Sequence, residues 1–355
     1  MSLKYFCFII FQEEQLQPSA NNNRDYLWKS FTLEKLCHAT NNFHEDNKIV
    51  ERGVGDVYRG RTSKGVEIAV KRLTGRNMNV KLQMEFAVKV EILGRVRHKN
   101  QLELRGFHAG AKELLIVYDY MPNHSLNTHL HCNLAADCLL DLPKRMNIAL
   151  GAAEGLANLH YEANSHIIHI DIKASNIEFE AKIVHFGSAM LVPEGVTTTM
   201  VKTLGYFAPE YAMLRKVSKS CDVYSFGILV LEIISGKKPI EKLGGRVKPH
   251  HIVEWVIPYV KKGVFNHIAD TRLKGKFDPL QLKSMVTLAI RYTDSSLENQ
   301  PSVVEVVDWL KEADPAGRSK KEIPNYQNVR GISKALKLRI NNMTKLILTV
   351  KQNLE

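Results

Sequence analysis

The pattern of apolar and polar positions changes about one third of the way along the chain. Before residue 121, short apolar runs broken by glycines predict strands at 57–58, 68–71 and 114–118, with helices at 32–42 and 84–96. After it, apolar residues recur every three or four positions and predict buried helices at 146–160, 223–234 and 303–310. Strands followed by helices predict an α+β fold, with a small sheet-rich lobe and a larger helical lobe.

This pattern divides the chain into four parts. Residues 1–30 form a Gln- and Asn-rich N-terminal extension that we expect to be loose. A small lobe with a flanking helix is predicted at 31–121, a helical lobe at 122–312 and a basic tail at 313–355. The turn residues Met121-Pro122-Asn123 mark the hinge between the two lobes.

Charge and cysteine content narrow the range of functions. The 355-residue chain has a formal net charge of +12. About half of this excess lies in 311–355, with ten Lys and Arg against four Asp and Glu, so the body is only mildly basic. We therefore expect no nucleic-acid binding. Five cysteines without a C-x-x-C pair indicate neither a zinc site nor a disulfide framework, and they favour a reducing cytosol.

The N-terminal apolar run does not indicate a membrane anchor. It covers 5–11, far short of the roughly 18 residues that a membrane-spanning helix needs. One lysine precedes it and no small-residue cleavage site follows, so we expect a packed or frayed N-terminus rather than a signal peptide. Ser2 after Met1 excludes N-myristoylation. These features predict a cytoplasmic protein.

Two tripeptides carry the most chemical information, His169-Ile170-Asp171 and His185-Phe186-Gly187. Between them, Ile172-Lys173-Ala174-Ser175-Asn176 contributes a lysine and an asparagine. The spacing is that of H-R-D-x-K-x-x-x-N followed by D-F-G, the catalytic and magnesium loops of protein kinases.

Further stretches extend this match over about residues 30 to 312. They are Phe31-Thr32-Leu33-Glu34 through Ala39-Thr40-Asn41-Asn42-Phe43, Ile68-Ala69-Val70-Lys71-Arg72-Leu73, Met84-Glu85-Phe86-Ala87-Val88, Ile116-Val117-Tyr118-Asp119-Tyr120-Met121-Pro122, Ala208-Pro209-Glu210-Tyr211-Ala212-Met213 and Cys221-Asp222-Val223-Tyr224-Ser225-Phe226-Gly227. On these stretches the chain resembles plant receptor-like kinases, most closely the Pti-like receptor-like cytoplasmic kinases. The resemblance implies a bilobal protein-kinase fold that uses ATP and Mg²⁺ to phosphorylate protein hydroxyls.

The resemblance also implies roles for individual residues. Lys71 matches the lysine on the α- and β-phosphates, Asp171 the base that orients the substrate hydroxyl, and Lys173 the lysine on the γ-phosphate. Asn176 matches the ligand of the second metal ion. The other implied nucleotide contacts are Gly53, Gly55, Val57, Ala69, Asp119 and Met121. A carboxylate that only bonds its own loop remains the alternative for Asp171.

Six positions depart from the family's pattern: Val50, Arg52, Lys89, Ile170, His185 and Gln300. Val50 and Arg52 replace two glycines of the nucleotide lid, and Ile170 replaces the arginine that reads a phosphorylated activation loop. Lys89 replaces the helix glutamate that pairs with Lys71. Two ammonium groups 4 Å apart repel by roughly 4 kcal/mol at an effective dielectric of 20. Glu85, one turn earlier, is an alternative partner if the helix slides.

His185 has the largest expected effect on chemistry. Magnesium prefers oxygen ligands, and neutral imidazole lacks the negative charge of the aspartate that it replaces. Gln300 replaces the arginine that pairs with Glu210 in the family. The segment 176–185 is also shorter than the family's hairpin. A zinc site at His169 and His185 is a minor alternative, because neither pairs with a cysteine at ligand spacing.

The activation segment is predicted at 188–210. Its candidate phosphoacceptors are Thr197, Thr198, Thr199, Thr203 and Tyr206. The alternative is that the three consecutive threonines form only a polar loop.

The C-terminal tail has an apolar stripe at helical spacing, formed by Ile332, Leu336, Ile340, Met343, Ile347 and Val350, with lysines and arginines mostly around it. Such a basic amphipathic helix suits an anionic membrane, here the inner face of the plasma membrane, or a calmodulin-like partner. A helix docked on the large lobe or a disordered end is the alternative.

The sequence as a whole predicts a signalling pseudokinase that acts by binding other signalling proteins, including an upstream kinase. Arg52, Lys89, His185 and Gln300 each alter a different part of the catalytic machinery. Two alternatives stay open: a weakly active Ser/Thr or Tyr kinase that relies on the surviving catalytic residues, and a decayed gene product that folds poorly.

Overall fold

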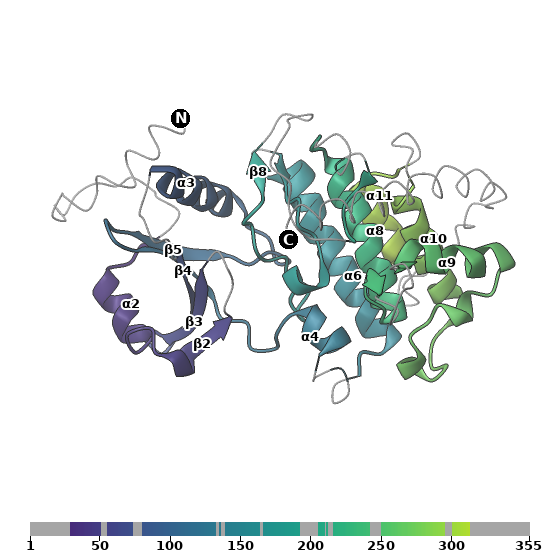
Figure 1. Ribbon diagram of the computed structural model, residues 1–355, viewed down its shortest axis with the longest axis horizontal. Helices are drawn as coiled ribbons and strands as arrows, with labels where there is room; N and C mark the ends of the chain where they lie inside the picture. Colours follow the sequence, from purple (N-terminus) through teal and green to yellow (C-terminus); the bar gives the residue numbers. More distant parts are fainter. Residues whose placement is uncertain are drawn as a thin grey trace, which may run out of the picture. The chain divides into compact units, whose positions relative to one another are not determined.

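The computed structural model describes residues 29–50, 55–73, 80–132, 135, 139–163, 166–191, 205–209, 211, 216–241, 250–294 and 300–312. The chain divides into two compact units, Met1–Pro122 and Asn123–Glu355. The first holds a mainly antiparallel sheet and the second is mostly helical (Figure 1), which confirms the predicted α+β class. In these ranges no helix combines the length and apolar character needed to cross a membrane.

The first unit is built on a six-stranded sheet in the order β1-β5-β6-β4-β3-β2. Only β1 and β5 pair in parallel, and the other neighbours are antiparallel. The apolar pattern predicts three of the six strands. One of the strands that it misses is β5, because a register shift at Gly106 breaks the alternation there. The strands are β1 (Lys29–Ser30), β2 (Lys48–Val50), β3 (Asp56–Arg61), β4 (Glu67–Leu73), β5 (Leu104–Ala109) and β6 (Leu114–Asp119).

Helix α2 (Leu33–Ala39) packs against one face of this sheet. Thr32 caps its start, because its Oγ1 accepts a hydrogen bond from the backbone N–H of Lys35 at 3.4 Å. The predicted helix end at 42 is wrong, since α2 ends at Ala39. The buried cluster beneath it consists of Leu36, Phe43, Tyr58, Ile68, Val70, Leu115 and Val117.

A left-handed turn follows α2 and explains its early end. Asn41, Asn42 and Phe43 have φ values of 52°, 54° and 55°. Asparagine tolerates this region, whereas phenylalanine is strained there. The strain at Phe43 is balanced by burial, by a hydrogen bond of its N–H to Thr40 Oγ1 at 3.1 Å, and by the Arg72 guanidinium 4.7 Å from the ring centroid.

Helix α3 (Val80–Arg95) packs against β5 and β6, and Figure 1 shows α3 and α2 on different sides of β4 and β5. The Phe86 ring of α3 meets the Phe107 ring of β5 edge-on, with centroids 6.1 Å apart. The helix predicted at 84–96 is confirmed, and it begins about one turn earlier. The sheet is therefore covered on both faces.

The second unit is organised around α8 (Lys219–Ser235), whose residues from Cys221 to Ser235 are all buried. A helix that is apolar on every side must be surrounded by other helices, and α8 packs against α6, α9 and α10. Its other helices are α4 (Leu126–His131), α6 (Leu142–Ala157), α9 (Ile252–Lys262), α10 (Pro279–Tyr292) and α11 (Val303–Glu312). Its short strand pairs are β7 (Ile167–Ile168) with β8 (Met190–Leu191) and β9 (Ile240–Glu241) with β10 (His250–His251).

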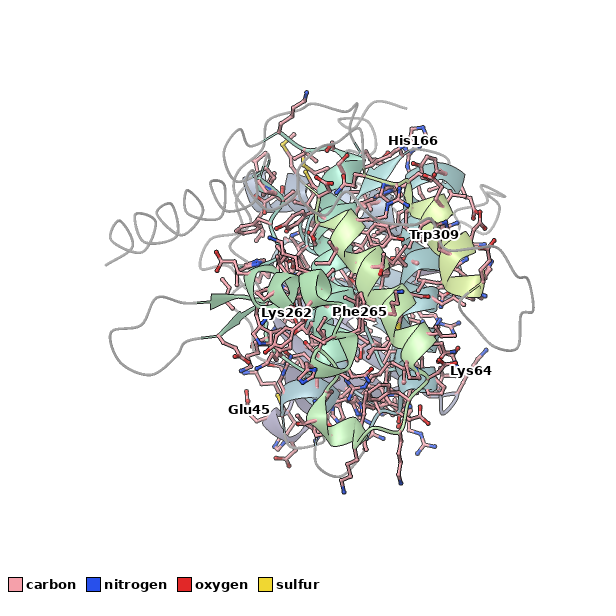
Figure 2. All side chains as sticks on the ribbon, turned by 90° about the vertical axis from the view of Figure 1, so that its right-hand side faces the viewer. Glu45, Lys64, His166, Lys262, Phe265 and Trp309 are labelled. Atoms are coloured by element: carbon pink, nitrogen blue, oxygen red, sulfur yellow. The ribbon has the colours of Figure 1, made fainter. Side chains whose placement is uncertain are left out.

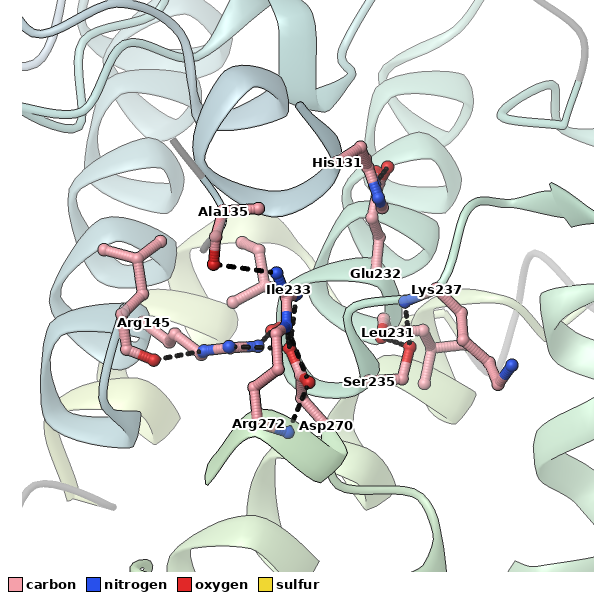
Figure 3. A network of polar contacts seen from close by, with 11 residues as sticks. His131, Ala135, Arg145, Leu231, Glu232, Ile233, Ser235, Lys237, Asp270 and Arg272 are labelled. Atoms are coloured by element: carbon pink, nitrogen blue, oxygen red, sulfur yellow. Dashed lines mark hydrogen bonds and ion pairs between the residues drawn. The ribbon is translucent and has the colours of Figure 1, made fainter. Parts of the chain in front are cut away.

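A buried ionic network ties α6 to the segments around α8 (Figure 3). Arg145 is 1% exposed; its Nε donates to the Leu140 carbonyl at 2.8 Å and its Nη2 to Asp270 Oδ2 at 2.7 Å. Arg272 also donates to Asp270. Burial alone would raise the pKa of Asp270, but hydrogen bonds from Arg272 and Arg145 outweigh it and hold that pKa below its usual value.

Aromatic rings form a row along the exposed side of α9. Trp255 and Tyr259 meet edge-on at 5.4 Å, and Tyr259 stacks on His267 at 5.9 Å. Lys262 and Phe265, labelled in Figure 2, lie near the end of α9 and in the 3₁₀ turn Phe265–His267 that follows it. These ring contacts hold that turn against the helix.

The cap of α9 is a buried histidine that we expect to make folding acid-sensitive. His251 Nε2 donates to the Gly205 carbonyl at 2.9 Å, and Nδ1 accepts from the Val253 N–H at 3.4 Å. Burial lowers the pKa of His251 from 6.5 to about 4. In the unfolded chain His251 therefore binds a proton near pH 6.5, whereas in the folded chain it binds one only as the pH approaches 4. The stability that His251 contributes above pH 6.5 is lost as the pH falls towards 4.

We expect the His251→Asn variant to lose less stability on acidification than the wild type, by about 2 kcal/mol between pH 7 and pH 4.5. Asparagine is a good helix cap that does not titrate, so it keeps the hydrogen bond to Val253 and removes the proton linkage. Urea denaturation at both pH values measures the difference. Equal losses in the two proteins would show that His251 is not the group responsible.

Candidate functional site

Asp222, in the first turn of α8, anchors the segment 169–176, which we call the catalytic loop. Its buried carboxylate accepts the backbone N–H of His169 at 2.8 Å and that of Ile170 at 2.7 Å. The same carboxylate accepts a hydrogen bond from His160 Nε2 at 2.9 Å. Three donors on one carboxylate fix the position of the loop relative to the central helix of the unit.

Two of the departing residues have left-handed backbone. The φ values are 65° for Ile170 and 67° for His185. A β-branched residue is rarely found there, so Ile170 is strained, and Asp222 holds its peptide in place. Burial of the Ile170 side chain offsets part of this cost.

The structure brings the three predicted catalytic residues together. Lys173 Nζ lies 2.8 Å from Asp171 Oδ2, and Asn176 Nδ2 donates to the same oxygen at 2.8 Å. Asn176 Nδ2 also donates to the Asp171 carbonyl at 2.8 Å. The side-chain oxygen of Asn176, Oδ1, is buried and has no hydrogen-bond partner within the described ranges. An acceptor atom is therefore held ready beside the Asp171 carboxylate.

The segment that contains His185 packs onto the catalytic loop. The Phe186 ring meets the His169 ring edge-on at 5.2 Å. His169 Nε2 bonds the Val184 carbonyl at 3.1 Å, and Nδ1 accepts the Asp171 N–H at 3.3 Å. Both ring nitrogens of His169 form hydrogen bonds, and burial lowers its pKa. We therefore assign His169 a structural role. The predicted alternative of a zinc site there has no support.

The short hairpin between Asn176 and His185 is well formed. Ile177 pairs with Ile183, and the Glu178 N–H donates to the Lys182 carbonyl at 2.9 Å. The tight turn is closed by Ala181, whose φ is 59° and whose N–H donates to Glu178 at 2.8 Å. The shortened sequence thus still closes a hydrogen-bonded hairpin.

The predicted nucleotide contacts of the first unit lie on its sheet and at the end of β6. Lys71 and Ala69 lie in β4, Val57 in β3, and Asp119 ends β6, where it pairs with Arg105. Gly55 has a φ of 135°, and a Cβ there would meet the Arg72 carbonyl at 2.3 Å, so only glycine fits. Met121 follows β6, and Val50 ends β2. Arg52 and Gly53 lie outside the described residues.

Lys89 lies in α3 and is partly buried. Burial lowers its pKa, and the nearby carboxylate of Glu85 opposes that effect. Glu91 pairs with Arg95 at 2.5 Å. An ammonium group thus occupies the helix position at which the resemblance calls for a carboxylate.

Similarity to known proteins agrees with this geometry. Residues 43–322, more than three quarters of the chain, match the family model described as protein kinase domain. The chain belongs to the protein kinase domain family.

Several plant kinases resemble this kinase domain along most of its length. A PTI1-like tyrosine-protein kinase of Arabidopsis thaliana is 42% identical over 291 residues, 80% of this chain and 80% of the relative. The proline-rich receptor-like protein kinases PERK1 and PERK15 of the same species are 36% and 34% identical over 79% and 83% of this chain. The chain spans only 44% of PERK1 and 60% of PERK15. The predicted relation to plant receptor-like cytoplasmic kinases is confirmed.

Protein kinases use ATP with Mg²⁺, and the residues of this kinase domain fit that pair only in part. Asn176 Oδ1 is a buried, unpartnered oxygen of the kind that Mg²⁺ prefers. At position 185, however, an imidazole replaces the carboxylate that holds the main ion. Within the described ranges, no three His, Cys, Asp or Glu side chains cluster in a way that could hold a metal ion. The donor set does not fit two magnesium ions.

Gln300 keeps a structural contact after the loss of arginine at its position. Its Nε2 donates to the Tyr292 carbonyl at 2.7 Å, whereas its Oε1 is buried without a partner in the described part of the chain. Its predicted former partner Glu210 lies outside the described residues, as do Thr197, Thr198, Thr199 and Thr203. The phosphoacceptor prediction for these threonines therefore stays a prediction.

One buried network near the catalytic loop could not be predicted from the sequence. The Tyr206 hydroxyl donates to Glu232 and accepts the Ala174 N–H at 3.4 Å, while His131 Nε2 lies 2.8 Å from the other Glu232 oxygen. Burial, followed by the charge of Glu232, raises the pKa of Tyr206. Tyr206 is only 9% exposed and its hydroxyl is engaged, and its role as a phosphoacceptor stays a prediction. No local pattern reveals a contact between residues so far apart in sequence.

Proposed function

We propose that this kinase domain acts in signalling by binding other proteins, without ordinary phosphoryl transfer. The observation that carries the proposal is His185, which has left-handed backbone but brings no negative charge to the main metal position. Transfer of the γ-phosphoryl group depends on Mg²⁺ to neutralise the charge that develops in the transition state. Without that carboxylate, the chemical step loses its principal electrostatic support.

The intact framework around the site supports a role in binding. Asp222 still holds the catalytic loop through two backbone hydrogen bonds and binds His160 through a third, and Phe186 still packs on His169. The surfaces of the fold thus remain available for partners while the chemistry is weakened.

The proposed partners are other signalling proteins, including an upstream kinase, and the proposed place of action is the cytoplasm. The similarity to a protein named as a PTI1-like tyrosine-protein kinase supports the protein-kinase fold on which this proposal is built. The basic tail at 313–355, which lies outside the described residues, is the proposed contact for the inner plasma-membrane surface or a calmodulin-like protein.

Incorporation of labelled phosphate from ATP tests the proposal. We expect the purified wild-type chain, with Mg²⁺ or Mn²⁺ and a peptide mixture containing Ser, Thr and Tyr, to incorporate no more label than Asp171→Ala. A single cooperative melting transition in the same preparation would exclude the alternative of a poorly folding product. Clear incorporation by the wild type that Asp171→Ala abolishes would overturn the proposal.

The second candidate function is a weakly active protein kinase. The unpartnered Oδ1 of Asn176 favours it, because that buried oxygen can accept one divalent ion beside Asp171. Lys173, close to Asp171, would then be placed to contact the transferred phosphate. This candidate predicts slow, metal-dependent labelling that is lost in Asn176→Ala as well as in Asp171→Ala.

A further inference from the structure

Helix α9 has one side in the core of the second unit and another at its surface. Ile252, Val253 and Val256 are buried, and α9 packs against α8. Trp255 and Tyr259 lie four positions apart, so they share one side of the helix, and both are only partly buried. The rings of these two residues therefore lie at the surface, outside the core.

Neighbouring segments extend this surface. The Tyr259 ring stacks on His267, and the same 3₁₀ turn carries Phe265. The ammonium group of Lys283 in α10 lies 5.8 Å from the centroid of the Phe265 ring, and Leu280, three positions earlier, is 70% exposed. One continuous surface thus runs from α9 through the turn to the start of α10. We call it the aromatic face, and its rings are those of Trp255, Tyr259, Phe265 and His267.

Lysines border the aromatic face. The ammonium group of Lys237 lies 5.0 Å from the centroid of the Trp255 ring. Lys262 follows Tyr259 by three positions in α9, and Figure 2 shows it next to Phe265 on the side turned to the viewer. The rings are therefore flanked by positive charge at both ends of α9.

The acidic residues of this part of the chain do not offset that charge. Lysines outnumber acidic residues between positions 237 and 283, and Lys262 and Lys283 are exposed. The carboxylates in this stretch already accept hydrogen bonds within the fold; they belong to Glu241, Glu254, Asp270 and Asp278. The border of the aromatic face is consequently basic.

We propose that the aromatic face binds an acidic segment of a partner protein that carries aromatic side chains. The inference rests on the proposed function and deepens it, because it names the surface through which this kinase domain binds a signalling protein. Aromatic residues supply much of the binding energy at protein interfaces. Rings that already contact one another lose little conformational entropy when a partner binds, and the surrounding lysines favour an acidic partner.

A membrane surface fits these observations less well. An interfacial helix buries its aliphatic side among lipid chains, whereas the aliphatic side of α9 packs against α8. The Trp255 and Tyr259 rings are 5.4 Å apart, and Tyr259 stacks on His267. They form one fixed surface rather than separate side chains that could insert between lipids.

Binding of a defined acidic polymer tests the inference. The probe is an immobilised random copolymer of glutamate and tyrosine, offered to the full chain without ATP and compared with polyglutamate and polylysine. We expect the copolymer to bind more tightly than polyglutamate, because its rings contact the aromatic face, and polylysine not to bind. A change in tryptophan fluorescence on binding, lost in Trp255→Phe, is the second readout.

Matched variants identify the surface responsible. We expect Trp255→Ala to weaken copolymer binding about tenfold, or roughly 1.4 kcal/mol. Trp309→Ala is the control. Trp309 of α11 is also partly buried, with the Arg291 guanidinium 4.9 Å from its ring centroid, and its loss should leave binding unchanged. Unchanged melting temperatures of the unliganded variants would exclude a folding defect.

Charge reversal gives a test that does not depend on packing. Lys262 is exposed, and we expect Lys262→Glu to weaken binding of both acidic polymers by about fivefold. Lys64→Glu makes the same change on the exposed turn between β3 and β4, labelled in Figure 2, and should leave binding unchanged.

Three results would overturn the inference. They are equal copolymer binding by wild type, Trp255→Ala and Lys262→Glu, equal affinity for copolymer and polyglutamate, and absence of copolymer binding. If the chain instead binds vesicles of phosphatidylserine and phosphatidylcholine, and both variants lose that binding, the face belongs to a membrane and the inference is wrong. Labelled-phosphate transfer is measured separately, so turnover would contradict the proposed function without changing the result of the polymer titrations.

Discussion

The double variant His185→Asp, Lys89→Glu is expected to gain phosphoryl transfer on the order of 100-fold over the wild-type chain. Aspartate at 185 returns an anionic oxygen ligand beside Asn176, and the left-handed backbone of His185 (φ 67°) is one that aspartate adopts more readily than most residues. Glutamate at 89 returns to α3 the carboxylate that the family carries at this position. Labelled phosphate from ATP with Mg²⁺ measures the gain.

Single variants and a loop mutant complete this experiment. His185→Asp alone should recover only part of the activity, because position 89 would still lack the carboxylate that the family carries there. Adding Asp171→Ala to the double variant should abolish the gain, which would place the chemistry in the catalytic loop. Activity of the double variant no higher than that of the wild type would show that the lid residues or the short hairpin, rather than the metal position, limit catalysis.

Arg145→Ala is expected to destabilise the chain by about 3–5 kcal/mol, because it removes one partner of a buried ion pair. The guanidinium is 1% exposed and donates to Asp270 and to the Leu140 and Ile233 carbonyls, so its loss leaves three buried acceptors with fewer partners (Figure 3). Urea denaturation measures the loss, and the melting temperature should fall on the order of 10 °C.

Arg272→Ala is the matched control for that measurement. Arg272 donates to the same carboxylate of Asp270, but its side chain is 30% exposed and water can replace it. We expect Arg272→Ala to lower the free energy of unfolding by about 1 kcal/mol. If the two variants lose the same free energy of unfolding, the burial of Arg145 is not what determines its contribution to stability.

Much of the fold could be predicted because its signals are local. The helical spacing in 223–234 falls inside α8, and the apolar run 114–118 falls inside β6, since each pattern reflects neighbours along the chain. The end of α2 was misplaced because the left-handed turn at Asn41 to Phe43 depends on Thr40 and on packing against Tyr58. Tertiary contacts decided that boundary.

The candidate site, like the fold, could be predicted from the sequence only in part. The match to the family's motif singled out Asp171, Lys173 and Asn176, and the structure places Lys173 and Asn176 within hydrogen-bonding distance of Asp171. The unpartnered oxygen of Asn176 and the burial of Tyr206 were not predictable, because both depend on which atoms of distant segments surround them. Spacing identifies residues, but it cannot assign hydrogen-bond partners.

The sequence by itself determined the kinase family and the identity of each altered position, because motifs with fixed spacing survive where single residues change. Only the tertiary structure decided that Arg145 meets Asp270 across 125 residues, and that Tyr206 is buried against Glu232. The physical reason is that charge pairing and desolvation act through space. Their strength depends on burial and distance, which a linear pattern does not contain.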